Sequence, residues 1–133
     1  MKKSFKLISL ITILALNSCE EKDEPYNPKV EILGKWQIIE IGNWPDMHAY
    51  NDGVYWEFLT DSVLQYYDIA SGNPFTLHEK YWFNDTELWI RLPLHDTLTF
   101  DQSYNYYFFQ DKLRLEKNDN PPIYRSFLLL KIK

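Results

Sequence analysis

From Val30 to its last residue the chain is a succession of short apolar segments, and none of them sustains the spacing of an amphipathic helix. Aromatic residues, Ile and Leu alternate with polar residues, and the segments break at turn signals at positions 60–61, 84–85 and 110–111. Alternation with a period of two places one set of side chains on each face of a strand. The sequence therefore predicts an all-β body.

Eight or nine strands are expected in this body. Pro93 is predicted to end one of them, because Pro has no N–H to donate to a ladder. Consecutive strands joined by tight turns favour an antiparallel up-and-down barrel, which leaves no edge exposed. The alternative is a two-sheet β-sandwich. The predicted strands are residues 33–41, 54–59, 62–69, 75–83, 87–92, 98–100, 104–109, 113–116 and 123–132.

The first 18 residues have the pattern of a signal peptide. Three Lys lie within the first six residues, and an apolar run follows from Leu7 to Leu16. This run is about ten residues long, shorter than the roughly 20 that a membrane-spanning helix requires. Residues 1–18 are therefore expected to be removed rather than to form part of the folded protein.

Leu16-Asn17-Ser18-Cys19 resembles the lipobox of bacterial lipoproteins. The resemblance implies that Cys19 becomes the first residue of the mature chain and is acylated, for example with palmitate. It also implies a lipid bilayer as partner, with the protein anchored in the outer membrane of a Gram-negative bacterium. The alternative is ordinary secretion with a buried thiol at Cys19.

Residues 19–31 are acidic and Pro-containing, and they are expected to form a disordered tether ahead of a barrel domain at residues 32–133. Acidic residues directly after a lipidated Cys resemble the signal that exports some lipoproteins to the outside of the outer membrane. The alternative is a solvated linker that carries no address.

Charge and cysteine content exclude several classes of function. Without residues 1–18 the chain has 11 Lys and Arg against 19 Asp and Glu. Nucleic-acid binding draws on clustered basic residues, so no nucleic-acid partner is expected. Cys19 is the only Cys, which rules out an intramolecular disulfide, and no Cys/His pair has structural-zinc spacing.

Gly34-Lys35-Trp36 opens the first predicted strand and resembles the G-x-W signature of lipocalins. Gly lets the chain bend tightly into the strand, and Trp36 is large enough to plug the base of a barrel. In lipocalins an Arg near the last strand commonly packs across this Trp, and the resemblance assigns that role to Arg125. Residues 56–63 are also similar to a hairpin of short bacterial lipocalin-like lipoproteins, with Ser62 where Gly is usual. An ordinary strand with a core Trp is the alternative.

A barrel of eight strands either fills with side chains or holds one small molecule. The favoured function is a binding module for a small apolar or aromatic ligand. The alternative is a filled-barrel interaction protein, such as an inhibitor or accessory subunit of an envelope complex. In lipocalins the first loop covers the open mouth, which assigns residues 42–52 to a lid. The candidate ligand-binding residues are Trp44, Met47, His48, Tyr50, Trp56, Phe58, Tyr66, Tyr81, Tyr104 and Tyr106.

No catalytic function, cofactor or metal is expected. The chain contains no G-x-S-x-G, H-E-x-x-H, Walker or G-x-G-x-x-G motif. His48, His78 and His95 are scattered along the sequence, without the spacing of metal ligands on one element.

Overall fold

The computed structural model of the chain describes residues 26–95, 98–118 and 125–133. Within them it has one short helix, α1 (Pro28–Glu31), and nine strands, so the all-β prediction is confirmed. The strands are β1 (Gly34–Asn43), β2 (Asp46–Ala49), β3 (Val54–Phe58), β4 (Val63–Asp68), β5 (Pro74–Asn84), β6 (Glu87–His95), β7 (Leu98–Phe109), β8 (Lys112–Lys117) and β9 (Ser126–Ile132).

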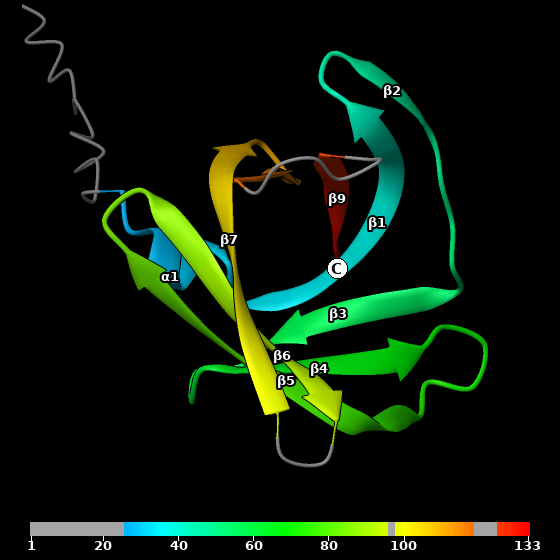
Figure 1. Ribbon diagram of the computed structural model, residues 1–133. Coiled ribbons are helices and arrows are strands. Elements are labelled where there is room, and N and C mark those ends of the chain that lie inside the picture. The colour runs from blue at the N-terminus through cyan, green and yellow to red at the C-terminus, as the bar shows by residue number, and fades with distance from the viewer. Residues whose placement is uncertain (1–25, 96–97, 119–124) are drawn as a thin grey trace, which may run out of the picture.

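All nine strands belong to one antiparallel sheet that closes into a ring (Figure 1). Hydrogen bonding runs from β1 to β3 and then in chain order to β9, which pairs back with β1. The predicted up-and-down arrangement is therefore confirmed in a barrel-like form. The two-sheet sandwich is wrong, because the ladder continues all the way round.

Strand β2 stands outside the ring and was not predicted. Along one edge of β1, residues Gly34–Gln37 pair with β3, whereas Glu40–Asn43 pair with β2. Gly42 lies where the two arms of the β1–β2 hairpin approach most closely. A Cβ added there would meet the backbone O of Asp46 at 2.3 Å. Because glycine has no side chain, the two arms of the hairpin can approach each other this closely at Gly42.

The half of the ring beside α1, here called the closed end, has a solid core. Trp36 is only 1% exposed, and its indole Nε1 donates a hydrogen bond to the carbonyl O of Ile32 at 2.7 Å. Inward side chains from the ring strands pack around these two residues and fill the space. The buried cluster that includes these two residues extends along the inside of the ring, and its other members are Ile38, Phe58, Leu64, Tyr81, Leu88, Ile90, Tyr104, Leu113, Leu115 and Leu129.

Helix α1 covers the closed end, so the predicted tether is too long. Asn27 caps the helix by accepting a hydrogen bond from the backbone N of Lys29. Tyr26 packs edge-on against Phe108 with ring centroids 6.1 Å apart. The domain therefore includes residues 26–31, because these few side chains complete the cover over Ile32. Residues 1–25 lie outside the described part.

Two strand boundaries differ from the prediction. Residues 98–109 form one continuous strand, β7, rather than two. Strand β6 passes through Pro93, which is paired with Thr99 of β7. Pro93 is tolerated because β5 pairs with β6 only as far as Arg91, so that beyond this residue β6 has a partner on one side only. Residues 123–124, the start of the last predicted strand, lie outside the described residues.

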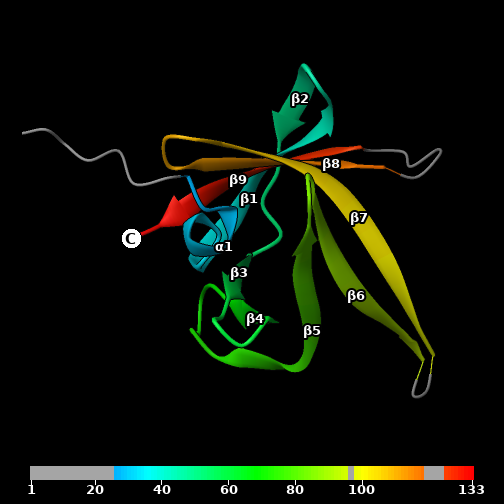
Figure 2. The ribbon, with the colours of Figure 1, turned by 90° about the vertical axis from the view of Figure 1, so that its left-hand side faces the viewer.

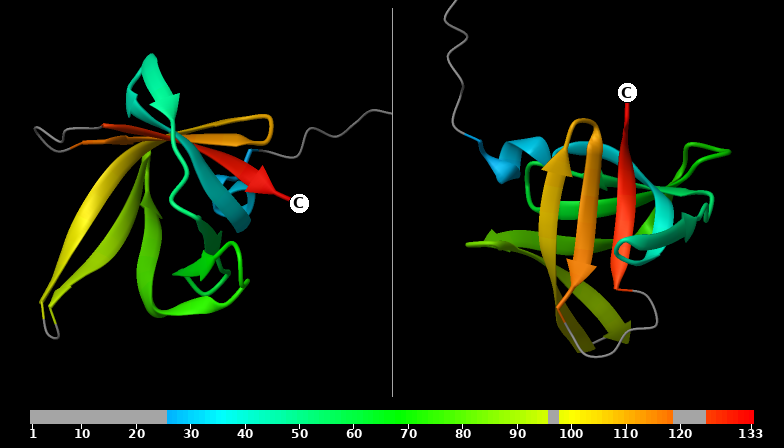
Figure 3. Two further views of the ribbon diagram at one scale, coloured as in Figure 1. Left: turned by 90° about the vertical axis from the view of Figure 1, so that its right-hand side faces the viewer. Right: turned by 90° about the horizontal axis from the view of Figure 1, so that it is seen from above.

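The ring is split at the end remote from α1, here called the open end. Strand β5 pairs with β6 only through Lys80–Asn84, while the preceding half of β5 pairs with β4. Residues 75–77 stand opposite the single residue Tyr66, and the Nε2 of Gln65 donates to the carbonyl O of Phe75 at 2.8 Å. Strand β5 is thus held by β4 while the β6–β7 hairpin diverges from it (Figure 2; Figure 3, left).

Candidate functional site

Four large apolar side chains lie at the open end and are exposed to solvent. Phe75 and Leu77 belong to β5, and Leu98 and Phe100 belong to β7. Their exposed fractions lie between 40% and 58%. By strand alternation Phe75 and Leu77 share the inward side of β5 with Glu79, and Leu98 and Phe100 share that of β7 with Gln102. We call these four residues the apolar mouth.

Below the mouth lies a buried carboxylate. Glu79 is 8% exposed, and its Oε2 accepts a hydrogen bond from the phenol of Tyr66. Burial raises the pKa of Glu79 above its usual value, and the hydrogen bond from Tyr66 opposes this rise. Burial, followed by the charge of Glu79, also raises the pKa of Tyr66, so the phenol keeps its proton.

Aromatic rings surround this pair. Trp56 meets Tyr66 edge to face, with ring centroids 5.6 Å apart and planes at 88°. Tyr104 packs in the same manner against Phe127, at 6.3 Å, and adds to the electrostatic environment of Tyr66. A polar group embedded among rings, with an apolar approach from solvent, is the usual composition of a small-molecule site.

Six of the predicted ligand-binding residues point inward, but only three lie around Glu79. Trp56, Tyr66 and Tyr104 form the surroundings just described. The other three contribute to the closed end. Phe58 is buried in the core, Tyr106 packs between Phe83 and Phe108 at 5.1 and 5.9 Å, and the Tyr81 hydroxyl donates to the carbonyl O of Leu59 at 2.5 Å.

The predicted lid over the mouth is wrong. Figure 2 shows β2 on the opposite side of β8 and β9 from strands β3 to β6. Trp44 stacks there on the outward guanidinium of Arg114, with its ring centroid 4.1 Å from Cζ, and Tyr107 stacks on the same group at 4.3 Å. The Trp44 backbone N also bonds the hydroxyl of Ser126 at 3.3 Å. These contacts hold the hairpin against the outer face of the sheet.

The same hairpin carries Met47, His48 and Tyr50, which do not reach the mouth. Met47 and His48 lie on β2, opposite Gly42 and Ile41 of β1. The backbone N of Tyr50 donates to the carbonyl O of Ile39 at 2.9 Å. The lid prediction assumed a free loop, whereas residues 46–49 extend the sheet.

A cation does pack over Trp36, but it is not Arg125. The Nζ of Lys131 lies 5.1 Å from the Trp36 ring centroid. Antiparallel pairing places Lys131 directly opposite Trp36, whereas Arg125 lies at the other end of β9, where its backbone N donates to the carbonyl O of Gly42. Gly34 has a φ of +108°, which favours Gly at this bend into β1.

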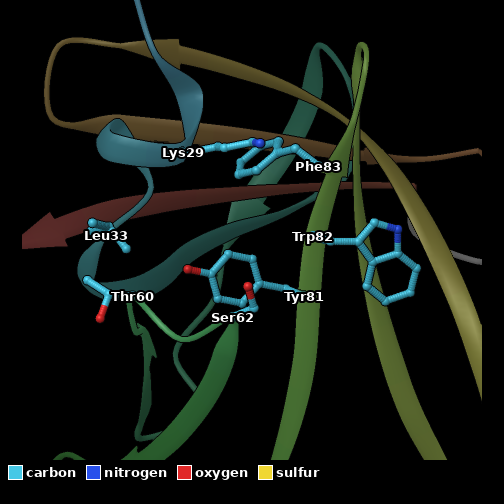
Figure 4. Close-up of a pocket in the computed structure, with 7 residues that line it drawn as sticks. All are labelled: Lys29, Leu33, Thr60, Ser62, Tyr81, Trp82 and Phe83. Carbon is cyan, nitrogen blue, oxygen red and sulfur yellow. The ribbon is translucent and has the colours of Figure 1, made fainter.

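A concavity of about 260 Å³ lies at the closed end between α1 and β5 (Figure 4). Lys29 extends along the Phe83 ring at its rim, while Trp82 points to the other side of β5. The one deep polar group, the Tyr81 hydroxyl, is already bonded to Leu59. The other polar side chains that line this pocket are Lys29, Thr60 and Ser62.

Sequence reasoning missed Glu79 and all four residues of the apolar mouth. Positions 75, 77, 79, 81 and 83 alternate as Phe, Leu, Glu, Tyr and Phe, so the signal was an acidic residue at an otherwise apolar inward position.

Within the described ranges, no group of three or more His, Cys, Asp or Glu is placed to hold a metal ion. No helix there is long and apolar enough to cross a membrane. The chain matches no protein-family model, and no curated protein is significantly similar to it in sequence.

Proposed function

We propose that the protein is a lipid-anchored, lipocalin-like binding module that takes up a small apolar or aromatic ligand at its open end. The observation that carries this proposal is the exposure of the apolar mouth on the inward side of the ring. Exposed apolar patches on folded proteins often mark ligand-binding or interaction sites. A ligand that covers them gains roughly 25 cal/mol for each Å² of apolar surface removed from water.

The closed end supports this proposal as a rigid base. Trp36, Leu64 and Leu88 are almost completely buried there, so the strands that lead to the mouth are fixed at one end. A site built on strands that a packed core holds in place requires little reorganisation on binding.

The lipid anchor at Cys19 gives the binding module an orientation. Six residues separate Cys19 from Tyr26, and they span at most about 20 Å when fully extended. Tyr26 contacts Phe108 at the closed end. An acylated Cys19 therefore attaches the outer membrane to the side of the ring opposite the mouth, which leaves the mouth directed away from that membrane.

A second function is favoured by a separate surface. Trp44, Tyr107 and Phe109 are all at least 40% exposed on the outer face around Arg114. Trp, Tyr and Arg are the residue types that dominate protein–protein contacts. The alternative proposal is therefore an interaction protein that presents this outer cluster to another envelope protein.

Phe100 and Phe109 provide a matched test of the two functions. Both lie on β7 and both are 40% exposed, but Phe100 belongs to the mouth and Phe109 to the outer face. Binding of the neutral fluorophore N-phenyl-1-naphthylamine is measured by fluorescence titration. Phe100→Ser is expected to weaken binding about fivefold or more, and Phe109→Ser to change it less than about twofold. Equal losses, or no saturable binding, would overturn the mouth as the site.

A further inference from the structure

Glu79 is an ionisable group in a place where such groups are rarely found. Asp and Glu are almost never fully buried unless a partner neutralises them. Among the described residues, no Lys, Arg or His side chain forms an ion pair with Glu79; the ion pairs found there join Arg91 to Asp101 and Arg114 to Glu116. Its one hydrogen bond, from Tyr66, engages Oε2.

The second carboxylate oxygen of Glu79 is available to a ligand. Oε1 of Glu79 accepts no hydrogen bond from the described residues. It is also not among the side-chain polar atoms that are fully enclosed without a partner, where the described residues give only the Nε of Arg114. Glu79 is 8% exposed as a whole and shares its side of β5 with Leu77 of the mouth.

The aromatic rings beside Glu79 favour a positively charged ligand group, as does its carboxylate. Trp56 and Tyr66 meet edge to face, and this Trp56–Tyr66 corner adjoins Glu79 through the Tyr66 phenol. The face of an aromatic ring attracts cations, and aromatic walls with a carboxylate are a recurrent way to bind ammonium groups. A carboxylate at this depth repels an anionic head group. A neutral head group carries no positive charge that would compensate the carboxylate of Glu79.

We propose that the ligand of the open end is an amine, with its ammonium group against Glu79 and the Trp56–Tyr66 corner and its apolar body along the mouth. This inference rests on the proposed function, because it uses the same opening. It adds the chemical class of the ligand. In the empty protein burial raises the pKa of Glu79, and a bound ammonium group would lower it again.

Three probes with one apolar body test the inference. The cation 4-phenylbutylamine, the neutral 4-phenylbutanol and the anion 4-phenylbutyrate are compared by titration calorimetry at neutral pH with the purified chain that starts at residue 20. The amine is expected to bind about tenfold or more tightly than the alcohol, and the anion most weakly. If all three bind equally, the amine inference fails but the proposed function stands. If none binds and N-phenyl-1-naphthylamine does not bind either, the proposed function fails.

Matched variants locate the effect. Glu79→Gln keeps the size of the side chain and is expected to reduce the preference for the amine over the alcohol to about twofold or less, with the alcohol affinity unchanged. Glu57→Gln is the control, because Glu57 is a carboxylate that hydrogen-bonds Tyr67 on the outer side of the neighbouring strand pair. It should leave the preference intact. A preference that survives Glu79→Gln, or that Glu57→Gln abolishes equally, would overturn the assignment.

A second variant guards against a folding defect in Glu79→Gln. Tyr66→Phe removes the phenol and keeps the ring, so the carboxylate loses its one hydrogen bond. The preference for the amine is then expected to persist or to increase, since the ammonium group becomes the main partner of Glu79. Loss of the preference in Tyr66→Phe with the fold intact would contradict the role of Glu79 as the cation acceptor.

Discussion

At the scale of single residues, two Trp side chains of the same chain have opposite roles. Trp36 is buried at the closed end, where it bonds Ile32 and lies under Lys131. Trp44 is half exposed and stacks on Arg114 outside the ring. The first completes a core, and the second fastens a hairpin.

The two Trp→Ala variants should therefore differ in stability. Trp36→Ala removes a buried aromatic side chain and is expected to cost about 3–5 kcal/mol of the free energy of unfolding. Trp44→Ala loses one exposed stacking contact and should cost nearer to 1 kcal/mol. Urea denaturation of both variants measures the difference. Equal losses would show that one of the two placements is wrong.

Glu79 should make stability depend on pH. Its folded pKa lies above the usual value of 4.5, mainly because of burial, so the folded chain binds this proton more tightly than the unfolded chain. The resulting stabilisation is fully present below the unfolded pKa and is lost as the pH rises through the folded pKa. Tyr66 and Tyr104 are the other titratable groups near this site in the described part, and Tyr66 keeps its proton over this range.

Glu79→Gln removes the ionisable group, so the variant does not lose this stabilisation as the pH rises. From about pH 4 to about pH 8, the stability of the variant relative to the unaltered protein is expected to rise and then level off. Urea denaturation at a series of pH values measures this difference. A difference that does not change with pH, or that falls as the pH rises, would contradict a raised Glu79 pKa. A variant that is more stable at neutral pH yet binds the amine less well is the pattern expected of a residue kept for function.

At the scale of elements, β5 shows how much of the structure can be predicted from the sequence. Alternation along residues 75–83 predicts which side chains point inward, and the structure agrees for Tyr81 and Glu79. It does not predict that β5 changes its partner from β4 to β6 at Lys80, because pairing depends on the lengths and twists of three strands together. The position of the mouth follows from that change of partner.

The β1–β2 hairpin was misread for a related reason. Residues 42–52 contain Gly, Pro and Asp, and they read as a loop. Their strand character comes from contacts made across the sheet, namely Gly42 against Met47 and Trp44 against Arg114. The sequence of residues 42–52 carries no information on where Arg114 lies in the fold.

Gly42→Ala tests the hairpin as an element separate from the site. The added Cβ would collide with the backbone of Asp46, which should cost about 1–3 kcal/mol of stability. Because the hairpin lies outside the ring, the affinity for N-phenyl-1-naphthylamine is expected to change less than about twofold. Weaker binding with unchanged stability would indicate that the hairpin does reach the mouth.

At the scale of the whole molecule, the split ring has a packed closed end and an open end at which we propose that the ligand binds. The resemblance to lipocalin-like lipoproteins supports an anchor at Cys19, and Tyr26 joins the closed end. Cys19→Ala is expected to leave an unprocessed precursor or a soluble form, without incorporation of labelled palmitate. Palmitate labelling that persists in this variant would contradict the anchor.

Photolabelling tests most directly whether the ligand enters at the open end, as proposed. Benzophenone is neutral, aromatic and photoreactive, so its use does not depend on the amine inference. After irradiation at increasing concentrations, peptide mass spectrometry locates the covalent adducts. We expect saturable labelling of residues 75–77 and 98–100, competed by N-phenyl-1-naphthylamine. Saturable labelling confined to the outer cluster around Trp44 and Tyr107 would contradict it.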